Sequence, residues 1–380
     1  MKIITVIGAR PQIIKAAALN RAIKNHFKNQ LTEIILHTGQ HYDENMSEVF
    51  FRELGIPSPA YNLDVGSSLH GQQTALMMQG MEEVLVKEKP AAVVLYGDTN
   101  STLAGALAAS KMNIPVVHIE AGMRSFNKQM PEEINRIVCD HVSTLLFSPT
   151  ETGVKNLERE GFRLNNPGPY SMENPKVYHC GDVMYDNSLY FSELAEGKKE
   201  IFTGKGLKPG AFVLATLHRN TNTDSAERLN SIFSAFNYIS NRIPVILPLH
   251  PRTKNCLQQQ LSQKLYTETV NNKNLHIIPP VSFLEMIALE KNAALVLTDS
   301  GGVQKEAFYF KKPCVILRPE TEWVELVELG AAIAADAGEK KIISAFERLL
   351  KADLTSCPQV YGDGKAAEFI AGEIVKQIAR

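Results

Sequence analysis

The feature that most constrains the fold of this chain is a repeated alternation of short apolar runs with longer segments of helical pattern. In the first half, the runs cover Ile3–Ile7, Glu33–His37, Ala92–Tyr96, Val116–Ile119 and Leu145–Phe147, with helical stretches such as Leu76–Lys87 and Thr102–Lys111 between them. Continuously apolar runs are typical of parallel strands covered on both faces. The second half repeats the rhythm at Phe212–Thr216, Val245–Leu247, His276–Ile278, Leu295–Leu297 and Val315–Leu317. The pattern predicts an α/β protein with two Rossmann-like, doubly wound parallel sheets.

The boundary between the two predicted domains is expected near Asp182. The segment 165–175 is rich in turn-forming residues, but Val177–His179 after it looks like one more strand of the first sheet, so we expect a surface loop at 165–175. We therefore predict an N-terminal domain over residues 1–182 and a nucleotide-binding C-terminal domain over residues 183–364. The last segment, 365–380, is helical in pattern and is expected to pack back on the first domain.

Composition excludes several classes of protein. A hydrophobic content of 44% describes a globular protein, and a formal net charge of −1 argues against a nucleic-acid binder, which would show a basic excess. No apolar run approaches the roughly 20 residues that span a membrane. The first strand ends at Arg10 and Pro11, too early for a signal peptide. The five scattered cysteines are expected to be reduced thiols, which predicts a cytoplasmic protein.

The stretch from Asp299 to Glu306 predicts an anion site. It follows an apolar strand and opens a helix that Ser300 can cap, while Gly301 and Gly302 allow a ligand close to the backbone. Glu306 lies on the helix, where its carboxylate can accept hydrogen bonds from sugar hydroxyls. A nucleotide or nucleotide-sugar ligand is one interpretation, and a well-capped strand-to-helix turn is the other.

Polar residues also follow the other predicted strands, and ligands of open parallel sheets bind outside the carboxyl ends of the strands. Arg10 and Lys15, at the start of the first helix, can balance the charge of a phosphate. The remaining polar loops are Thr38–His41, Gly97–Asn100, Glu120–Arg124, Leu217–Arg219 and His250–Arg252.

Asp98, Glu120, Glu132 and Glu133 supply carboxylates, and His218 supplies an imidazole. A reaction that removes a proton from carbon and returns it on the opposite face needs such an acid and base on two sides. For Asp98 a buried helix cap is the alternative, and Glu132 and Glu133 can be first-turn acids of a helix.

The sequence also argues against several kinds of site. Gly8 does not begin a GxGxxG motif, so a dinucleotide cofactor is not supported. His37 and His41 straddle a strand end with no third ligand in view, so we expect no metal. No nucleophile elbow or phosphate-binding P-loop spacing is present.

Taken together, these loops resemble the non-hydrolysing UDP-N-acetylglucosamine 2-epimerase family over essentially the whole chain. The stretches that carry the resemblance are Gly8–Pro11, Gly39–His41, Gly97–Thr99, His118–Arg124, Pro131–Arg136, His218–Arg219, Asp299–Glu306 and Thr321–Glu322. The resemblance implies two Rossmann-like domains in a GT-B arrangement with an interdomain cleft. It also implies inversion at C2 of a UDP-N-acetylhexosamine without a redox cofactor, through elimination and re-addition of UDP, and a homodimer.

The resemblance assigns roles to individual residues. The catalytic positions match Asp98, Glu120, Glu132 and His218. The expected UDP- and substrate-binding residues are Arg10, Lys15, His41, Arg136, Asn220, His250, Ser300, Gly301, Gly302, Glu306 and Arg318.

Departures from the family pattern bear on the substrate. Gln12 and Thr221 stand where much of the family has Glu, and Thr321–Trp323 matches members that act on UDP-2,3-diacetamido-2,3-dideoxyglucuronate. A uronate substrate adds a carboxylate, which favours a less negative pocket. Gln12 can equally be a neutral substitution at a helix start. The segment His70–Gln73 lacks the arginine with which bacterial relatives bind an activating second UDP-GlcNAc, so we expect weak or absent activation.

Three other functions compete with this interpretation. A GT-B glycosyltransferase has the same fold but needs an acceptor, and a hydrolysing 2-epimerase releases UDP. A non-catalytic sugar-nucleotide sensor has no use for His218 and the acidic residues.

Overall fold

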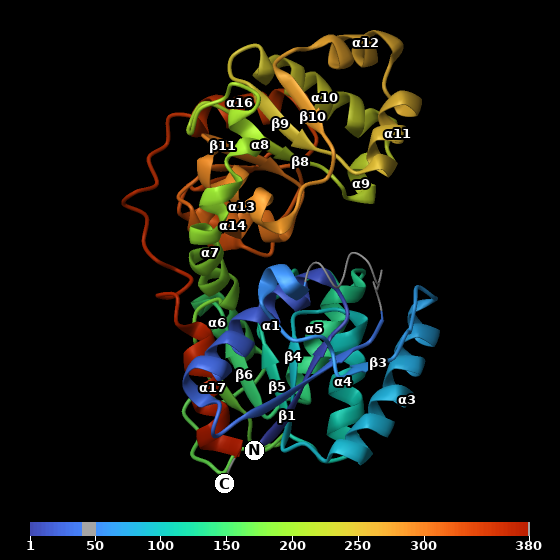
Figure 1. Ribbon diagram of the computed structural model, residues 1–380, viewed down its shortest axis with the longest axis vertical. Coiled ribbons are helices and arrows are strands. Elements are labelled where there is room, and N and C mark those ends of the chain that lie inside the picture. The colour runs from blue at the N-terminus through green and yellow to red at the C-terminus, as the bar shows by residue number, and fades with distance from the viewer. Residues whose placement is uncertain (40–50, 379–380) are drawn as a thin grey trace. The chain divides into compact units, whose positions relative to one another are not determined.

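The computed structural model describes residues 1–39 and 51–378, and it divides into two compact units (Figure 1). Unit 1 consists of Met1–Asn187 and Gln359–Arg380, and unit 2 consists of Ser188–Pro358. Each unit is built around its own parallel sheet.

The sheet of unit 1 has seven strands in the order β3-β2-β1-β4-β5-β6-β7, and every neighbouring pair is parallel. The strands are β1 (Lys2–Ile7), β2 (Thr32–His37), β3 (Tyr61–Asn62), β4 (Ala92–Tyr96), β5 (Val116–Ile119), β6 (Leu145–Ser148) and β7 (Lys176–His179). The order reverses between β1 and β4. In doubly wound sheets, ligands bind beside such a reversal, at the carboxyl ends of the strands.

Helices cover both faces of this sheet, because right-handed crossovers that run in opposite directions from the reversal place their helices on opposite faces. They are α1 (Arg10–Ala22), η1 (Ile23–Phe27), α3 (His70–Glu88), α4 (Asn100–Lys111), α5 (Pro131–His141), α6 (Glu151–Arg159), the first residues of α7 (Val183–Leu194), and α17 (Ala366–Ile378). The C-terminal helix α17 packs against α1 and η1, near the start of the chain (Figure 1). The hydroxyl of Tyr178 in β7 donates a hydrogen bond of 2.6 Å to Glu373 of α17, which ties this helix to the edge of the sheet.

The sheet of unit 2 has six parallel strands in the order β10-β9-β8-β11-β12-β13, which reverses between β8 and β11. The strands are β8 (Val213–Thr216), β9 (Val245–Pro248), β10 (Leu275–Ile278), β11 (Leu295–Thr298), β12 (Cys314–Ile316) and β13 (Ala332–Ala334). After the end of α7, the helices are η2 (Ala195–Lys198), α8 (Glu200–Thr203), α9 (Asn220–Thr223), α10 (Ala226–Ser240), α11 (Pro251–Gln260), α12 (Gln263–Asn271), α13 (Phe283–Asn292), α14 (Gly301–Tyr309), α15 (Val324–Glu328) and α16 (Glu339–Leu349).

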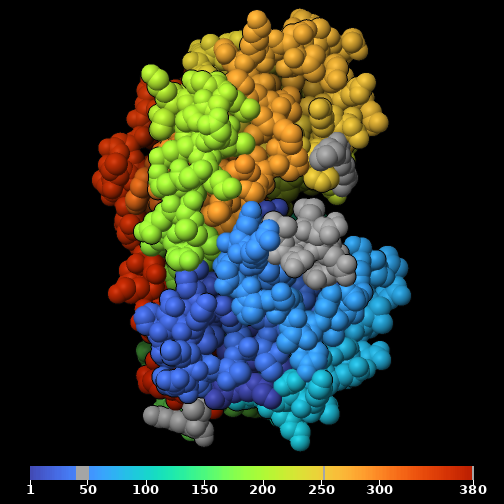
Figure 2. Space-filling view, viewed as in Figure 1, coloured from blue at the N-terminus to red at the C-terminus, as the bar shows by residue number. Residues whose placement is uncertain are grey.

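The core of unit 2 lies between this sheet and the pair α10 and α16, where Phe233, Phe236 and Phe346 are fully buried. The segment of η2 and α8 is largely exposed instead, and Figure 2 shows its surface in yellow-green. No helix among the described residues is long and apolar enough to span a membrane.

The predicted fold class is confirmed, because both sheets are parallel and doubly wound. Two strands were not predicted. β3 has only two residues, both at least partly exposed, and β13 is mainly alanine, so neither gives an apolar β-branched run. The strand predicted at Val315–Leu317 lies one residue earlier, at Cys314–Ile316.

Candidate active site

In unit 1, the turn after β1 is held by the side chain of Gln12. This residue is 2% exposed, and its amide makes four hydrogen bonds. Its Oε1 accepts from the N–H groups of Gly8 (2.9 Å) and Ala9 (3.2 Å), and its Nε2 donates to the Tyr96 carbonyl and to Thr102 Oγ1 (both 3.0 Å). Gln12 therefore joins the loops that follow β1 and β4, the two strands at the reversal.

Two carboxylates at this edge of the sheet are each paired with a buried cation. Lys15 Nζ lies 2.7 Å from Glu120 Oε2. Arg136 donates from Nε (2.9 Å) and Nη2 (2.6 Å) to Asp98 Oδ2. Burial raises the pKa of Asp98 above its ordinary value, against the attraction of Arg136 and Lys15, and the charge of Glu120 adds to the increase. Unit 1 thus brings together four of the expected site residues, Lys15, Asp98, Glu120 and Arg136.

The backbone of Glu120 is strained. Its φ is +77°, in the left-handed region that residues other than glycine rarely adopt. Such a conformation costs on the order of 1–3 kcal/mol and is typical of functional sites. The conformation is held because the Glu120 and Ala121 N–H groups both donate to the Phe147 carbonyl, each at 3.0 Å.

The two neighbouring glutamates of α5 differ in their surroundings. Glu132 is exposed, whereas Glu133 is 1% exposed. Glu133 accepts hydrogen bonds from the N–H groups of Ser125 and Phe126 (both 2.9 Å) and from Arg136 Nη1 (2.8 Å). Because these donors outweigh its burial, the pKa of Glu133 lies below its ordinary value. Arg136 thus bridges Glu133 and Asp98.

In unit 2, the loop after β11 opens helix α14 as predicted. Ser300 is the N-cap, and its hydroxyl accepts from the Val303 N–H at 3.5 Å. Gly301 and Gly302 occupy the first turn, where N–H groups have no acceptor within the helix. A Cβ at Gly301 would lie 2.5 Å from Glu322 Oε1, so a larger residue here would require the Glu322 carboxylate to shift. Glu306, partly exposed, follows one turn later on the same helix.

His218 and the α14 loop are joined by Asp299, which is fully buried. The Asp299 carboxylate accepts from the N–H groups of His218 (3.2 Å) and Arg219 (3.0 Å) and from Asn222 Nδ2 (3.1 Å). His218 Nδ1 also lies 3.2 Å from Asp299 Oδ1, while more than half of the His218 side chain is exposed. Asp299 therefore orients the imidazole and leaves its other face open to solvent.

A second group of side chains lies beside the first turn of α14. Arg318 is 6% exposed, and its Nη1 lies 3.0 Å from Glu322 Oε2. Lys305, which is 2% exposed, places its Nζ 3.9 Å from the centroid of the Trp323 ring. The neighbourhood of the predicted anion site thus contains two buried cations.

The remaining expected residues are less enclosed. Arg10 begins α1 and Asn220 begins α9, and both are exposed, as is His250 after β9. His41 lies outside the described residues. Over residues 1–39 and 51–378, no group of three or more His, Cys, Asp or Glu side chains is placed to hold a metal ion.

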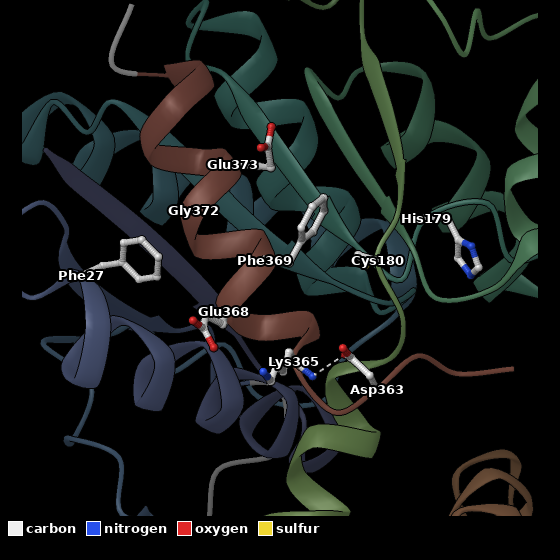
Figure 3. Close-up of a pocket in the computed structure, with 9 residues that line it drawn as sticks. All are labelled: Phe27, His179, Cys180, Asp363, Lys365, Glu368, Phe369, Gly372 and Glu373. Atoms are coloured by element: carbon white, nitrogen blue, oxygen red, sulfur yellow. Dashed lines mark hydrogen bonds between the residues drawn. The ribbon is translucent and has the colours of Figure 1, made fainter. Parts of the chain in front are cut away.

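A groove of about 460 Å³ in unit 1 lies elsewhere (Figure 3). It is lined by aromatic side chains of η1 and α17, by the end of β7 and by charged residues of the C-terminal segment: Phe27, His179, Cys180, Asp363, Lys365, Glu368, Phe369, Gly372 and Glu373. None of the expected site residues lines it, so it does not bear on the predicted chemistry.

The residues that hold the expected site residues in place are not evident from the sequence. The sequence favours Glu132 over Glu133, and it marks Asp299 only as the start of a motif. The signal for Asp299 is its place directly after a buried strand, where an unpaired carboxylate is costly and must have donors. No comparable signal marks Glu133, because its burial depends on which face of α5 packs against the rest of unit 1.

Comparison with known proteins agrees with this fold. Residues 22–375 match the model of the family described as UDP-N-acetylglucosamine 2-epimerase. A Pseudomonas aeruginosa protein named UDP-2,3-diacetamido-2,3-dideoxy-D-glucuronate 2-epimerase is 49% identical over 99% of this chain and 100% of its own length.

Solved structures give the same result. The Methanocaldococcus jannaschii UDP-GlcNAc 2-epimerase, solved in complex with UDP-GlcNAc and UDP, has a TM-score of 0.85 and 42% identity, with 99% of this chain and 100% of that one covered. A ugt transferase from Siraitia grosvenorii in complex with UDP has a TM-score of 0.63, with all of both chains covered. Its 11% identity shows a shared fold alone. On the family match and the level of identity over nearly the whole chain, this protein belongs to the UDP-N-acetylglucosamine 2-epimerase family.

Proposed function

We propose that this chain inverts the configuration at C2 of a UDP-N-acetylhexosamine, without hydrolysis and without a redox cofactor. A base removes the C2 proton, the C1–O bond breaks with its electron pair leaving on UDP, and a C1=C2 double bond forms. UDP then adds back to C1 as a proton reaches C2 on the opposite face. Atoms and charges balance, because UDP and one proton leave and return.

The observation that carries this proposal is the pair of carboxylates Asp98 and Glu120. They lie at one sheet edge and interact electrostatically, and the pKa of Asp98 is raised. Neighbouring carboxylates whose proton affinities differ can act as acid and base in one site. Lys15 and Arg136 hold them in place. Glu132, exposed on α5, is the third carboxylate we assign to proton transfer.

Unit 2 supplies groups suited to the leaving group. The first turn of α14 offers N–H groups and the positive end of a helix dipole to a pyrophosphate, and Glu306 can accept from ribose hydroxyls. His218, oriented by Asp299, can stabilise or protonate departing UDP. We assign Arg10, Asn220, His250, Gly302 and Arg318 to substrate binding on grounds of family resemblance, together with His41.

For the natural substrate we propose UDP-2,3-diacetamido-2,3-dideoxyglucuronate. The support is the 49% identity to the Pseudomonas aeruginosa protein of that name, together with the Thr321–Trp323 segment. Gln12 does not support this assignment. All four of its side-chain hydrogen bonds are internal, so its role is to hold the turn after β1.

Incubation in D₂O tests the reaction. The epimerase should incorporate deuterium at C2 and return a product that still carries UDP. A glycosyltransferase would need an acceptor, a hydrolysing 2-epimerase would release UDP, and a sensor would bind UDP without exchange. An absence of C2 labelling with both UDP-GlcNAc and the diacetamido-uronate would refute the proposal.

Steady-state rates with the two nucleotides test the substrate. We expect a higher kcat/KM for the diacetamido-uronate, and a clear preference for UDP-GlcNAc would contradict this assignment. We also propose a homodimer, which sedimentation equilibrium can check against the 42.1 kDa mass of one chain.

A further inference from the structure

His118 is buried in an interior strand of the unit 1 sheet with both ring nitrogens facing oxygen atoms. It lies in β5 and, like Asp140 of α5, has no exposed surface. Its Nδ1 lies 2.6 Å from Asp140 Oδ1, and its Nε2 lies 2.8 Å from the carbonyl oxygen of Gly97. A carbonyl can only accept, so Nε2 must carry a proton for this contact to be a hydrogen bond.

Asp140 must be ionised in the same arrangement. Its Oδ2 accepts from the Gly122 N–H at 3.1 Å and lies 2.7 Å from Arg124 Nη2. With a cation and a backbone N–H donor beside it, the carboxylate form is favoured, so the proton between Asp140 and His118 belongs to Nδ1. His118 is then doubly protonated, an imidazolium.

The directions of the pKa shifts of both groups agree with this assignment. Burial alone lowers the pKa of His118, but Cys139 and Asp140 reverse the effect, and the pKa lies well above its ordinary value. The pKa of Asp140 is below its ordinary value, because His118 and Arg124 outweigh burial.

The pair reaches the loops of both carboxylates through their backbone. The Gly97 carbonyl belongs to the peptide bond that leads into Asp98, and the Gly97 N–H donates to the Ile119 carbonyl at 3.0 Å. Both the N–H and the carbonyl group of Gly97 are thereby hydrogen-bonded to β5. On the other side, Asp140 holds Gly122, two residues after the strained Glu120.

We infer that His118 and Asp140 form a buried imidazolium–carboxylate pair that positions Asp98 and Glu120 for proton transfer. They are positioning residues rather than catalytic ones, because neither faces solvent. The inference rests on the proposed function in that Asp98 and Glu120 are its proton-transfer groups.

Two variants of His118 separate the two contacts. In His118→Gln, the side-chain amide reaches about as far as Nε2 and can still donate to the Gly97 carbonyl. In His118→Asn, the amide is placed like Nδ1, so it can donate to Asp140 but leaves Gly97 unheld. If positioning of Asp98 matters, His118→Asn should lose kcat by about 100-fold, the scale of a small displacement of a reacting group. His118→Gln should retain most of it, because Asp140 keeps its contacts with the Gly122 N–H and Arg124 and so still holds the loop of Glu120.

The KM for the sugar nucleotide and the affinity for UDP should not change in either variant. A general loss of structure would change both. The matched control is Asp186→Asn, another buried aspartate of unit 1 that bonds to α17 instead of these loops. A wild-type kcat in His118→Asn, or equal losses in both variants, would overturn the inference.

A measurement on the unmodified protein gives an independent answer. With ¹⁵N-labelled histidine, the ring nitrogens of His118 should both show the chemical shift of protonated nitrogens throughout the neutral range, unlike solvent-exposed histidines. A neutral His118 ring at pH 7 would overturn the ion pair even if neither variant folds. If the wild-type protein does not exchange the C2 proton, by contrast, the proposed function is wrong. The ¹⁵N spectrum of His118 would still test whether the ion pair with Asp140 exists.

Discussion

At the scale of single residues, Gly122 shows how closely the proposed site is packed. Its φ is +79°, and a Cβ at this position would lie 2.3 Å from the Gly153 carbonyl oxygen. Any side chain here must displace the backbone at the start of α6. The conformation and the contact together require glycine.

We expect Gly122→Ala to destabilise the protein by several kcal/mol and to lower its melting temperature clearly, because overpacking adds to backbone strain. Gly55→Ala is the control, since Gly55 also has a positive φ (+69°) but nothing lies within 4 Å of the added Cβ. It isolates the left-handed penalty of roughly 1–2 kcal/mol. Equal melting temperatures for the two variants would show that the contact with Gly153 is not close.

Asp98 gives a second prediction at this scale. Asp98→Asn keeps the size of the side chain and a partner for Arg136 but removes the exchangeable carboxyl proton. We expect the rate of C2 exchange in D₂O to fall by about 10²–10⁴-fold, the usual contribution of a positioned acid or base.

UDP affinity, measured by calorimetry, should be unchanged in Asp98→Asn, because the proposed pyrophosphate site is in unit 2. Asp64→Asn is an exposed control that leaves the carboxylate pair intact. Exchange at the wild-type rate in Asp98→Asn would remove Asp98 from the mechanism.

At the scale of elements, α17 is held at its first turn by a buried carboxylate. Asp186 accepts from the N–H groups of Ala366 (3.2 Å) and Ala367 (2.7 Å). Burial nevertheless raises the pKa of Asp186 from 3.8 to about 6, since it outweighs these hydrogen bonds. The folded state therefore favours the protonated acid.

The sign of the pH dependence follows from this shift. Because the pKa is higher in the folded than in the unfolded chain, the stabilisation is fully present below about pH 3.8 and is lost as pH rises through about 6. Between pH 5 and pH 8, the wild-type free energy of unfolding should fall by roughly 1–2 kcal/mol more than that of Asp186→Asn.

Urea unfolding at a series of pH values checks this prediction. Asp363→Asn, exposed near the same end of α17, should follow the wild type. Parallel pH curves for wild type and Asp186→Asn would contradict the effect of burial.

Helices and strands also differ in how far the sequence predicts them and their contacts. The central strands of both sheets are predictable because parallel strands covered on both faces are continuously apolar, and their carboxyl ends then locate Asp98, Glu120 and Asp299. The residues with which the site residues and their neighbours pair were not predicted. Arg136 meets Asp98, and Asp140 meets His118, only because α5 presents one particular face to the sheet, and spacing along the chain does not specify that face.

At the scale of the whole molecule, the residues around His70 bear on regulation. Gln73 is largely buried, donates to the Gly66 carbonyl at 3.0 Å and accepts from Asn100 Nδ2 at 2.7 Å. Its amide is therefore used within unit 1. With no arginine beside it, this segment offers little to a second UDP-GlcNAc.

Initial rates should accordingly depend hyperbolically on UDP-GlcNAc concentration. Sigmoidal curves, or acceleration of diacetamido-uronate turnover by added UDP-GlcNAc, would show an activating site after all.

The chain has one tryptophan, and its surroundings make it an optical reporter of nucleotide binding. Trp323 is 4% exposed and faces the ammonium group of Lys305, and its indole nitrogen lies 3.7 Å from the point that a Cβ on Gly301 would occupy. An anion arriving at the first turn of α14 would change the field across the ring. Emission excited at the indole band should therefore shift on titration with UDP, so that affinity can be followed in the unlabelled protein.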